Sequence, residues 1–144
     1  MLKKIFALLV CFIGLTIFIS ILHCQGSVNT ITLPSGEVVW DLNGEWDVFI
    51  EPYGPWISAG SFKRIYKITQ DGSSFVAIRT TDDSFNPKGS KALQGELDKS
   101  GIKKVQILTS VSPDPIDAKG QVSEDGNKII IDDGKKVRAT YTRK

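Results

Sequence analysis

The sequence predicts an all-β protein, a small antiparallel up-and-down β-barrel of about eight strands that follows one N-terminal hydrophobic helix. After residue 27, short runs rich in Val, Ile, Tyr, Phe and Thr recur, and no stretch keeps a helical period. Asp-Gly pairs separate several of these runs, and such pairs suit the tight turns of β-hairpins. Turns of this kind join neighbouring strands directly, which leaves no room for the crossover helices of a parallel sheet.

An apolar segment opens the chain. Lys3 and Lys4 are followed by uncharged, mostly apolar residues over 5–22. This order is typical of a secretory signal, and the apolar run is also long enough to cross a bilayer. We therefore assign 1–26 either to a signal peptide that is cleaved after Gly26 or to an uncleaved anchor that lies in the membrane through 5–22.

Cys24 offers a third interpretation of this segment, in which its thiol carries a lipid. His23 precedes it, where a lipid-attachment motif requires a small residue, so this interpretation is the least favoured. The basic pair at the start of the chain favours a cytoplasmic N-terminus. Every interpretation thus places residues 27–144 outside the cytoplasm, in a periplasm or facing outward from a membrane.

The rest of the chain divides into an extended lead-in over 27–40 and a barrel domain over 41–144. In the lead-in, 29–33 and 37–40 could pair as a hairpin around Pro34-Ser35-Gly36. In the barrel domain, the runs of strand-forming residues predict strands at 45–51, 62–69, 74–81, 92–97, 103–110, 117–123, 128–132 and 136–143.

Three longer segments of the barrel domain are expected to be irregular, at 51–60, 82–90 and 111–116. Pro113 and Pro115 lie in the last of them. Because proline has no backbone N–H to donate, we expect no paired central strand there. Long loops on a small β scaffold commonly carry binding residues.

Side chains alternate along the first and last expected barrel strands. Apolar side chains share one face of each strand: Trp46, Val48 and Ile50 in the first, and Val137, Ala139 and Tyr141 in the last. One apolar and one polar face fit a sheet that curls around a core. A repeat adds to this picture, because the spacing of glycine, aliphatic and lysine residues over 95–105 recurs over 120–130 and predicts two similar hairpins.

Charge excludes one large class of function. The sequence has 18 Lys and Arg and 16 Asp and Glu, and without Lys3 and Lys4 the two counts are equal. A nucleic-acid-binding protein needs a basic surface to displace phosphate counterions, so no nucleic acid is expected as a partner. The same balance argues against a polybasic lipid-binding surface.

The residues after 27 lack the side chains of several common active sites. His23 is the only histidine, and the two cysteines are Cys11 and Cys24. The domain therefore has no His or Cys for Ser-His-Asp or Cys-His catalysis or for zinc, copper and haem ligation. We expect no cofactor, no metal and no catalytic residue, and hence a protein that is not an enzyme.

Carboxylates keep one enzymatic alternative open, since an acid–base pair could be assembled across strands. Asp132 and Asp133 are adjacent, and adjacent residues of a strand point to opposite faces. We therefore expect these two carboxylates not to converge, and most carboxylates to be solvated charges at loop tips.

Four aromatic residues around the first long loop are the best candidates for contact with a ligand: Tyr53, Trp56, Phe62 and Tyr66. The alternative is that they form a hydrophobic plug over the barrel end. Arg79 follows an apolar run. It would either point into a cavity and fix an anionic group or lie on the outer face, which is the commoner position for a strand arginine.

The segment Asn43-Gly44-Glu45-Trp46-Asp47 resembles the Gly-x-Trp motif of lipocalins. The hairpin patterns at 70–76 and 120–129 are similar to those of small bacterial lipocalin-like domains, so the resemblance covers about residues 40–144. It implies that Trp46, after Gly44, packs across the closed barrel end beneath a basic side chain of the last strand. Two residues could supply that side chain: Arg138 and Arg143.

Two departures from the family pattern argue against a deep ligand cup, because the mid-chain Thr-Asp-Tyr motif is missing and the chain is shorter than a full lipocalin. An avidin-like small barrel is the nearest alternative. We expect an extracytoplasmic, non-catalytic binding protein for a small apolar or amphiphilic ligand or for another envelope component. The alternatives are a filled barrel that binds a protein partner, whose identity the sequence does not indicate, and a carboxylate-based enzyme.

Overall fold

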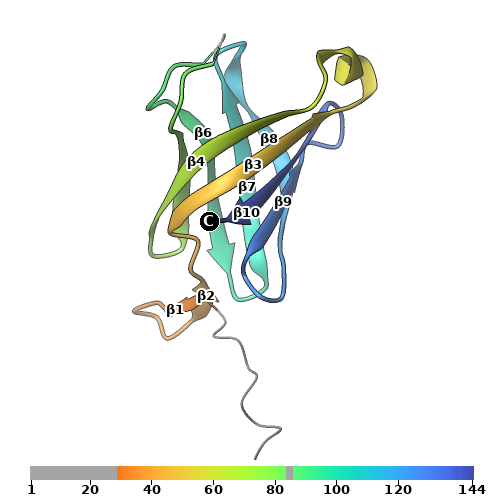
Figure 1. The fold of residues 1–144 in the computed structure, drawn as a ribbon. Coiled ribbons are helices and arrows are strands. Elements are labelled where there is room, and N and C mark those ends of the chain that lie inside the picture. The colour runs from red at the N-terminus through yellow and green to blue at the C-terminus, as the bar shows by residue number, and fades with distance from the viewer. Residues whose placement is uncertain (1–28, 84–85) are drawn as a thin grey trace, which may run out of the picture.

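The computed structural model describes residues 29–83 and 86–144, which form one closed β-barrel and a short N-terminal hairpin (Figure 1). The barrel strands are β3 (Gly44–Pro52), β4 (Phe62–Asp71), β5 (Ser74–Arg79), β6 (Lys91–Asp98), β7 (Gly101–Thr109), β8 (Ser112–Val122), β9 (Lys128–Asp132) and β10 (Val137–Arg143). Every pair is antiparallel, each strand pairs with its chain neighbours, and β10 pairs with β3 to close the ring. The predicted all-β up-and-down barrel is therefore confirmed.

The predictions for residues 1–26, including the N-terminal helix and the membrane segment 5–22, lie outside the described residues. Within the part of the chain that the structure describes, no helix has the length and apolar character needed to cross a bilayer.

A two-stranded hairpin covers one end of the barrel, where the lead-in was expected. Its strands are β1 (Thr30–Thr32) and β2 (Val38–Trp40). Gln70 ties this hairpin to the barrel, because its Nε2 donates to the Trp40 carbonyl (3.0 Å) and its Oε1 accepts from the Leu42 backbone N–H (2.7 Å). The Trp40 ring also packs on the turn between β8 and β9, where a Cβ added at Gly126 would lie 3.0 Å from it. We call this the closed end.

The hydrophobic core fills the barrel from the closed end to its middle. Inward and outward positions alternate along β3, where Trp46 and Val48 are buried and their neighbours are exposed, as the sequence pattern predicted. The largest fully buried side chains are Trp46, Phe75, Leu42, Ile68, Leu93, Ile129, Ile131, Val39, Val48 and Val105. The opposite end carries the loops after β3, β5, β7 and β9, and we call it the open end.

Two predicted loops differ from the observed structure. The segment 51–60 contains η1, a 3-10 helix (Gly54–Ala59) that begins with a proline near its first position, where a missing N–H costs nothing. Strand β8 begins at Ser112, so Pro113 and Pro115 lie within its bounds. The expectation that no paired central strand runs through them is confirmed, because the pairing of β7 passes from Ser112 to Ile116. The prolines are tolerated since the β7–β8 register shifts beside them and pairing with β9 begins only at Lys119.

Candidate functional site

Arg79 is the one charged side chain among the described residues that is buried, with 6% of its surface exposed. It ends β5 on the same face as the buried Phe75 and Ala77, so it points toward the inside of the barrel. The outer-face position, which is the commoner one for a strand arginine, is therefore the wrong prediction for Arg79, and the inward position is the observed one. The alternation of β5 continues through Arg79, and this continuation places the guanidinium inside.

The Arg79 guanidinium bridges two strands where they separate. Regular pairing of β6 with β7 ends at Leu93 and Ile107. Beyond that pair, Nη1 of Arg79 donates to the Lys91 carbonyl and to Ser90 Oγ (3.1 Å), and Nη2 donates to the Leu108 carbonyl (2.7 Å). The side chain thus takes the place of missing sheet hydrogen bonds.

Arg79 forms no ion pair with a carboxylate in the part of the chain that the structure describes. The ion pairs within 29–83 and 86–144 join Arg64 to Asp83, Arg138 to Asp132 and Lys144 to Glu45. Nε of Arg79 is buried and has no hydrogen-bond partner among the described residues. A buried cation whose partners are neutral is costly unless an anion comes close, so this guanidinium is a candidate for contact with a ligand.

Two tyrosines lie beside Arg79 inside the barrel. Tyr66 pairs in register with Arg79, and its ring centroid lies 6.0 Å from the guanidinium carbon. The Tyr141 ring lies 6.0 Å from the Tyr66 ring. Burial raises the pKa of both phenols, because a phenolate would lose its hydration there. Both groups are therefore uncharged at neutral pH and do not balance Arg79.

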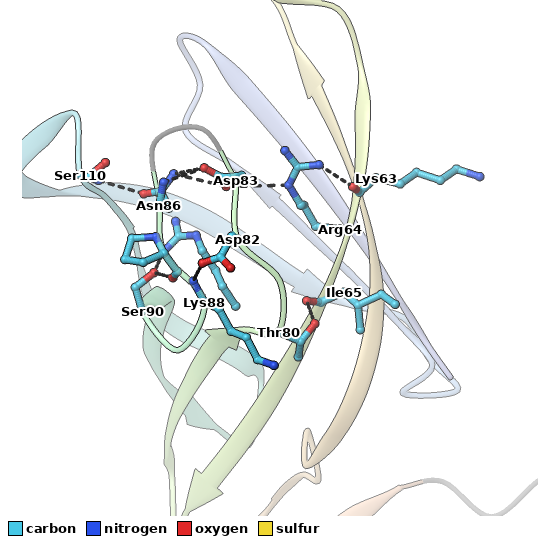
Figure 2. Close-up of polar contacts among 12 residues, drawn as sticks. Lys63, Arg64, Ile65, Thr80, Asp82, Asp83, Asn86, Lys88, Ser90 and Ser110 are labelled. Atoms are coloured by element: carbon cyan, nitrogen blue, oxygen red, sulfur yellow. Dashed lines mark hydrogen bonds and ion pairs between the residues drawn. The ribbon is translucent and has the colours of Figure 1, made fainter.

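The loop between β5 and β6 is fastened across the open end by polar contacts (Figure 2). Asp83 accepts hydrogen bonds from the backbone and side-chain nitrogens of Asn86 (2.7 and 3.1 Å), and Asn86 Oδ1 accepts from the Ser110 N–H (3.0 Å). Arg64 Nε lies 3.8 Å from Asp83 Oδ2. The described parts of this loop are thus held between β4 and the turn that follows β7.

A cavity of about 250 Å³ lies between this loop and the start of β8. Arg79 contributes to its wall, and so do two further charged residues, Lys91 and Asp114. The remaining wall combines apolar and small polar side chains: Pro87, Leu108, Pro113 and Pro115, with Asn86, Ser90, Thr109, Ser110 and Ser112. Most of these residues belong to 82–90 and 111–116, the segments that the sequence marked as long loops, but nothing in the sequence placed Arg79 behind them.

A second, wider depression of about 1300 Å³ lies at the outer side of the barrel beside η1. Tyr53 crosses it and donates a hydrogen bond to Asp132 (2.7 Å), with Asp133 Oδ1 at 3.4 Å. The expectation that these two carboxylates do not converge is wrong. The β9 strand ends at Asp132, so Asp133 lies in a turn and is free of the strand alternation.

Both carboxylates of this pair also build the turn around them. Asp133 Oδ1 accepts from the backbone N–H groups of residues 135, 136 and 137, and Asp132 accepts from Gly134 N and from Arg138 Nε. Hydrogen bonds lower the pKa of both carboxyl groups. Both carboxylates are therefore ionised, and their oxygens are already engaged in hydrogen bonds. Among the described residues, no group of three His, Cys, Asp or Glu could hold a metal ion.

The four predicted aromatic residues do not form one group. Tyr66 is buried inside, Phe62 lies at the rim with the Arg64 guanidinium 4.7 Å from its ring, and Tyr53 lies on the outside. Trp56 is 47% exposed and contacts the Lys136 ammonium (5.2 Å from its ring). No residue of η1 is buried, and in Figure 1 η1 projects beyond the barrel. It is therefore not a plug in the barrel end.

Trp46 lies at the closed end under a basic side chain. The Arg143 guanidinium carbon lies 4.5 Å from the ring centroid, and its Nη1 donates to the Asn43 carbonyl (2.7 Å). Gly44 has a positive φ of 134° and leaves room for Arg143, whose Nη1 would lie 3.4 Å from an added Cβ. Arg138 takes no part in this arrangement, because it pairs with Asp132 at the other end of β10.

No protein-family model matches the chain, and no curated protein and no solved structure matches it either. The eight-stranded antiparallel barrel is thus shown by the structure alone. What the protein binds has to be argued from the open end and its chemistry.

All three tyrosines are expected to titrate above their ordinary value of 10.0 while the protein is folded. The hydrogen bond to Asp132 raises the pKa of Tyr53 to about 12, and burial raises the other two. A raised pKa stabilises the native state fully below the ordinary value, and this contribution is lost as pH rises toward the native value. Alkaline difference spectroscopy of tyrosinate should show no ordinary tyrosine before the barrel unfolds, and a phase near pH 10 would contradict the described contacts.

Proposed function

We propose that this protein is an extracytoplasmic, non-catalytic binding protein of lipocalin-like type that takes a small amphiphilic ligand at the open end of its barrel. The observation that carries the proposal is the cavity of about 250 Å³ with Arg79 in its wall. It combines apolar surface from Leu108 and three prolines with a few polar groups, which is the usual composition of a small-molecule site.

The size of the cavity limits the ligand. Ligand pockets commonly measure about 300–1,000 Å³, so this cavity suits a headgroup and a short chain. The core fills the barrel from the closed end to the middle, and fully buried side chains such as Phe75, Leu93 and Val105 occupy the space that a deep cup would need. We therefore place the ligand at the rim.

The extracytoplasmic location rests on the sequence. Lys3, Lys4 and the apolar run 5–22 support export or anchoring. The chain enters the described structure at Asn29, next to the closed end, where its side-chain nitrogen lies 3.4 Å from Asn127 Oδ1. An anchor through 5–22 would thus join the barrel at the end opposite the cavity and leave the cavity accessible.

A second candidate function is a protein-interaction module, which the surface of η1 favours. Trp56 and Ile57 are 47% and 70% exposed, and large exposed apolar side chains that lie together are typical of contact surfaces. A carboxylate enzyme is less well supported. The converging carboxylates Asp132 and Asp133 have lowered pKa values, whereas a catalytic acid needs a raised one.

Native mass spectrometry of the protein, exported with its own N-terminal segment and purified without organic solvent, tests the proposal. We expect a reproducible extra mass that disappears on organic extraction.

The matched variants are Pro115→Trp, which places a large side chain in the cavity wall, and Pro55→Trp, which adds the same side chain on η1 outside the cavity. Loss of the extra mass in Pro115→Trp alone supports the site. An extra mass retained by Pro115→Trp would contradict it, and a chain without added mass that binds no short amphiphile would favour the interaction module.

A further inference from the structure

The structure assigns a charge to the ligand: we infer that the cavity at the open end binds the anionic headgroup of a short-chain amphiphile, with Arg79 as the group that attracts it. The inference rests on the proposed function, and it adds the chemical class of the ligand. The expected ligand carries a single carboxylate or phosphate group at the end of an apolar chain.

The charges of the cavity wall have an excess of one positive charge. Among the described lining residues, Arg79 and Lys91 are cationic and Asp114 alone is acidic. These three charges do not count equally. Lys91 and Asp114 are exposed, whereas Arg79 is 6% exposed. Water and salt screen exposed charges strongly and buried charges much less. The electrostatic potential in the cavity is therefore set mainly by the positive charge of Arg79.

The surroundings of Arg79 do not cancel this charge. Its hydrogen-bond acceptors are neutral, being two carbonyls and the Ser90 hydroxyl, and burial keeps Tyr66 and Tyr141 protonated. Arg64 and Asp83 add one positive and one negative charge to the same rim and so leave the excess unchanged. Within 29–83 and 86–144, Nε of Arg79 has no hydrogen-bond acceptor. An anion in the cavity would therefore offset a desolvation cost that the free protein already carries.

The rest of the lining accommodates the other parts of such a ligand. Thr109 offers a hydroxyl group, which can donate to a carboxylate or phosphate oxygen, whereas the Ser112 hydroxyl already donates to the Asp114 carbonyl (2.9 Å). Pro87, Pro113 and Pro115 offer rigid apolar surface for the first methylene groups. Rigid residues lose little conformational entropy on binding, so a short chain is sufficient.

The test is a calorimetric titration of the full chain with four probes of equal chain length: octanoate, octyl phosphate, octanol and octyltrimethylammonium. A charge-assisted hydrogen bond predicts that at least one anion binds about tenfold or more tightly than octanol. Comparison of octanoate with octyl phosphate shows whether the site prefers a carboxylate or a phosphate headgroup.

Equal binding of octanol and both anions would overturn the inference and leave the proposed function standing. Binding of none of the probes would overturn both, and preference for the ammonium probe would overturn the inference.

Two variants assign the preference to Arg79. Arg79→Gln removes the charge and keeps a donor, and it should abolish the difference between the anions and octanol. Arg79→Lys keeps the charge and should retain part of that difference. Because Arg79 also bridges β6 and β7, both variants need a thermal melt as a folding check. If Arg79→Gln does not fold, the probe series on the unchanged protein and on Arg79→Lys still decides the inference. Retained anion preference in folded Arg79→Gln would contradict the role of Arg79.

Discussion

Replacement of Trp46 by alanine is expected to remove much of the stability of the barrel. The side chain is fully buried at the closed end, and its Nε1 donates to the Leu42 carbonyl (3.0 Å). Truncation of a buried aromatic residue to alanine costs about 3–5 kcal/mol, and it would leave the Arg143 guanidinium without the ring that it covers. Since small domains have a free energy of unfolding of about 5–15 kcal/mol, this substitution should remove a large part or all of that free energy. Urea denaturation followed by circular dichroism measures the loss.

The matched control for this prediction is Trp56→Ala. Trp56 lies on η1, is 47% exposed and contacts Lys136 at the surface. Its replacement should change the free energy of unfolding by no more than about 0.5 kcal/mol. Similar losses for Trp46→Ala and Trp56→Ala would mean that the closed end does not hold the barrel together as described.

A single methyl group at Gly95 is expected to have the second largest effect. Gly95 lies in β6 opposite Phe75 of β5 and Val105 of β7. A Cβ there would lie 2.6 Å from Phe75 Cζ and even closer to the Lys104 carbonyl oxygen. The carbonyl belongs to the β7 backbone and cannot move without breaking the ladder. Overpacking of this kind costs about 3 kcal/mol, so the melting temperature of Gly95→Ala should fall clearly.

Gly120→Ala is the control, because it makes the same change in the second copy of the repeat. The three atoms nearest to the added Cβ all belong to the Ile102 side chain, with its two terminal carbons Cδ1 and Cγ2 at 2.8 Å and its Cβ at 3.1 Å. The two nearest carbons of Ile102 can move by a rotamer change, and its Cβ at 3.1 Å needs only a small shift, whereas the Lys104 carbonyl cannot move without disturbing the sheet. The loss should therefore be smaller than for Gly95→Ala. If Gly120→Ala is as destabilising as Gly95→Ala, the backbone contact is not the cause.

The sequence predicted the barrel well because its signals are local. Alternating side chains such as Trp46 and Val48, and turn pairs such as Asp71-Gly72, act over a few residues, and closure then follows from strand pairing. The start of β8 was mispredicted because the effect of Pro113 depends on whether a neighbouring strand needs its N–H, and β9 is too short to reach it.

The candidate site was harder to predict because its parts meet only in three dimensions. Arg79 was recognised as a candidate, but the sequence could not show that β6 and β7 separate beside it and expose the carbonyls of Lys91 and Leu108. The aromatic residues were grouped by closeness in sequence. Tyr66 lies within β4 and faces the inside of the barrel, whereas Trp56 lies on η1 and is exposed. Asp132 and Asp133 were expected to diverge because strand alternation was applied to both, although the predicted strand 128–132 and β9 both end at Asp132.

The most direct test of the account is a chemical-shift map of the isotope-labelled protein titrated with octanoate, because it locates the binding site without a substitution. The account predicts saturable shifts confined to the backbone amides of the open end, over 86–91 and 108–115 and at Arg79. It predicts no change at the closed end, around Trp46 and Arg143. Shifts that concentrate at the closed end, or that spread over the barrel without saturating, would contradict a ligand site at the open end.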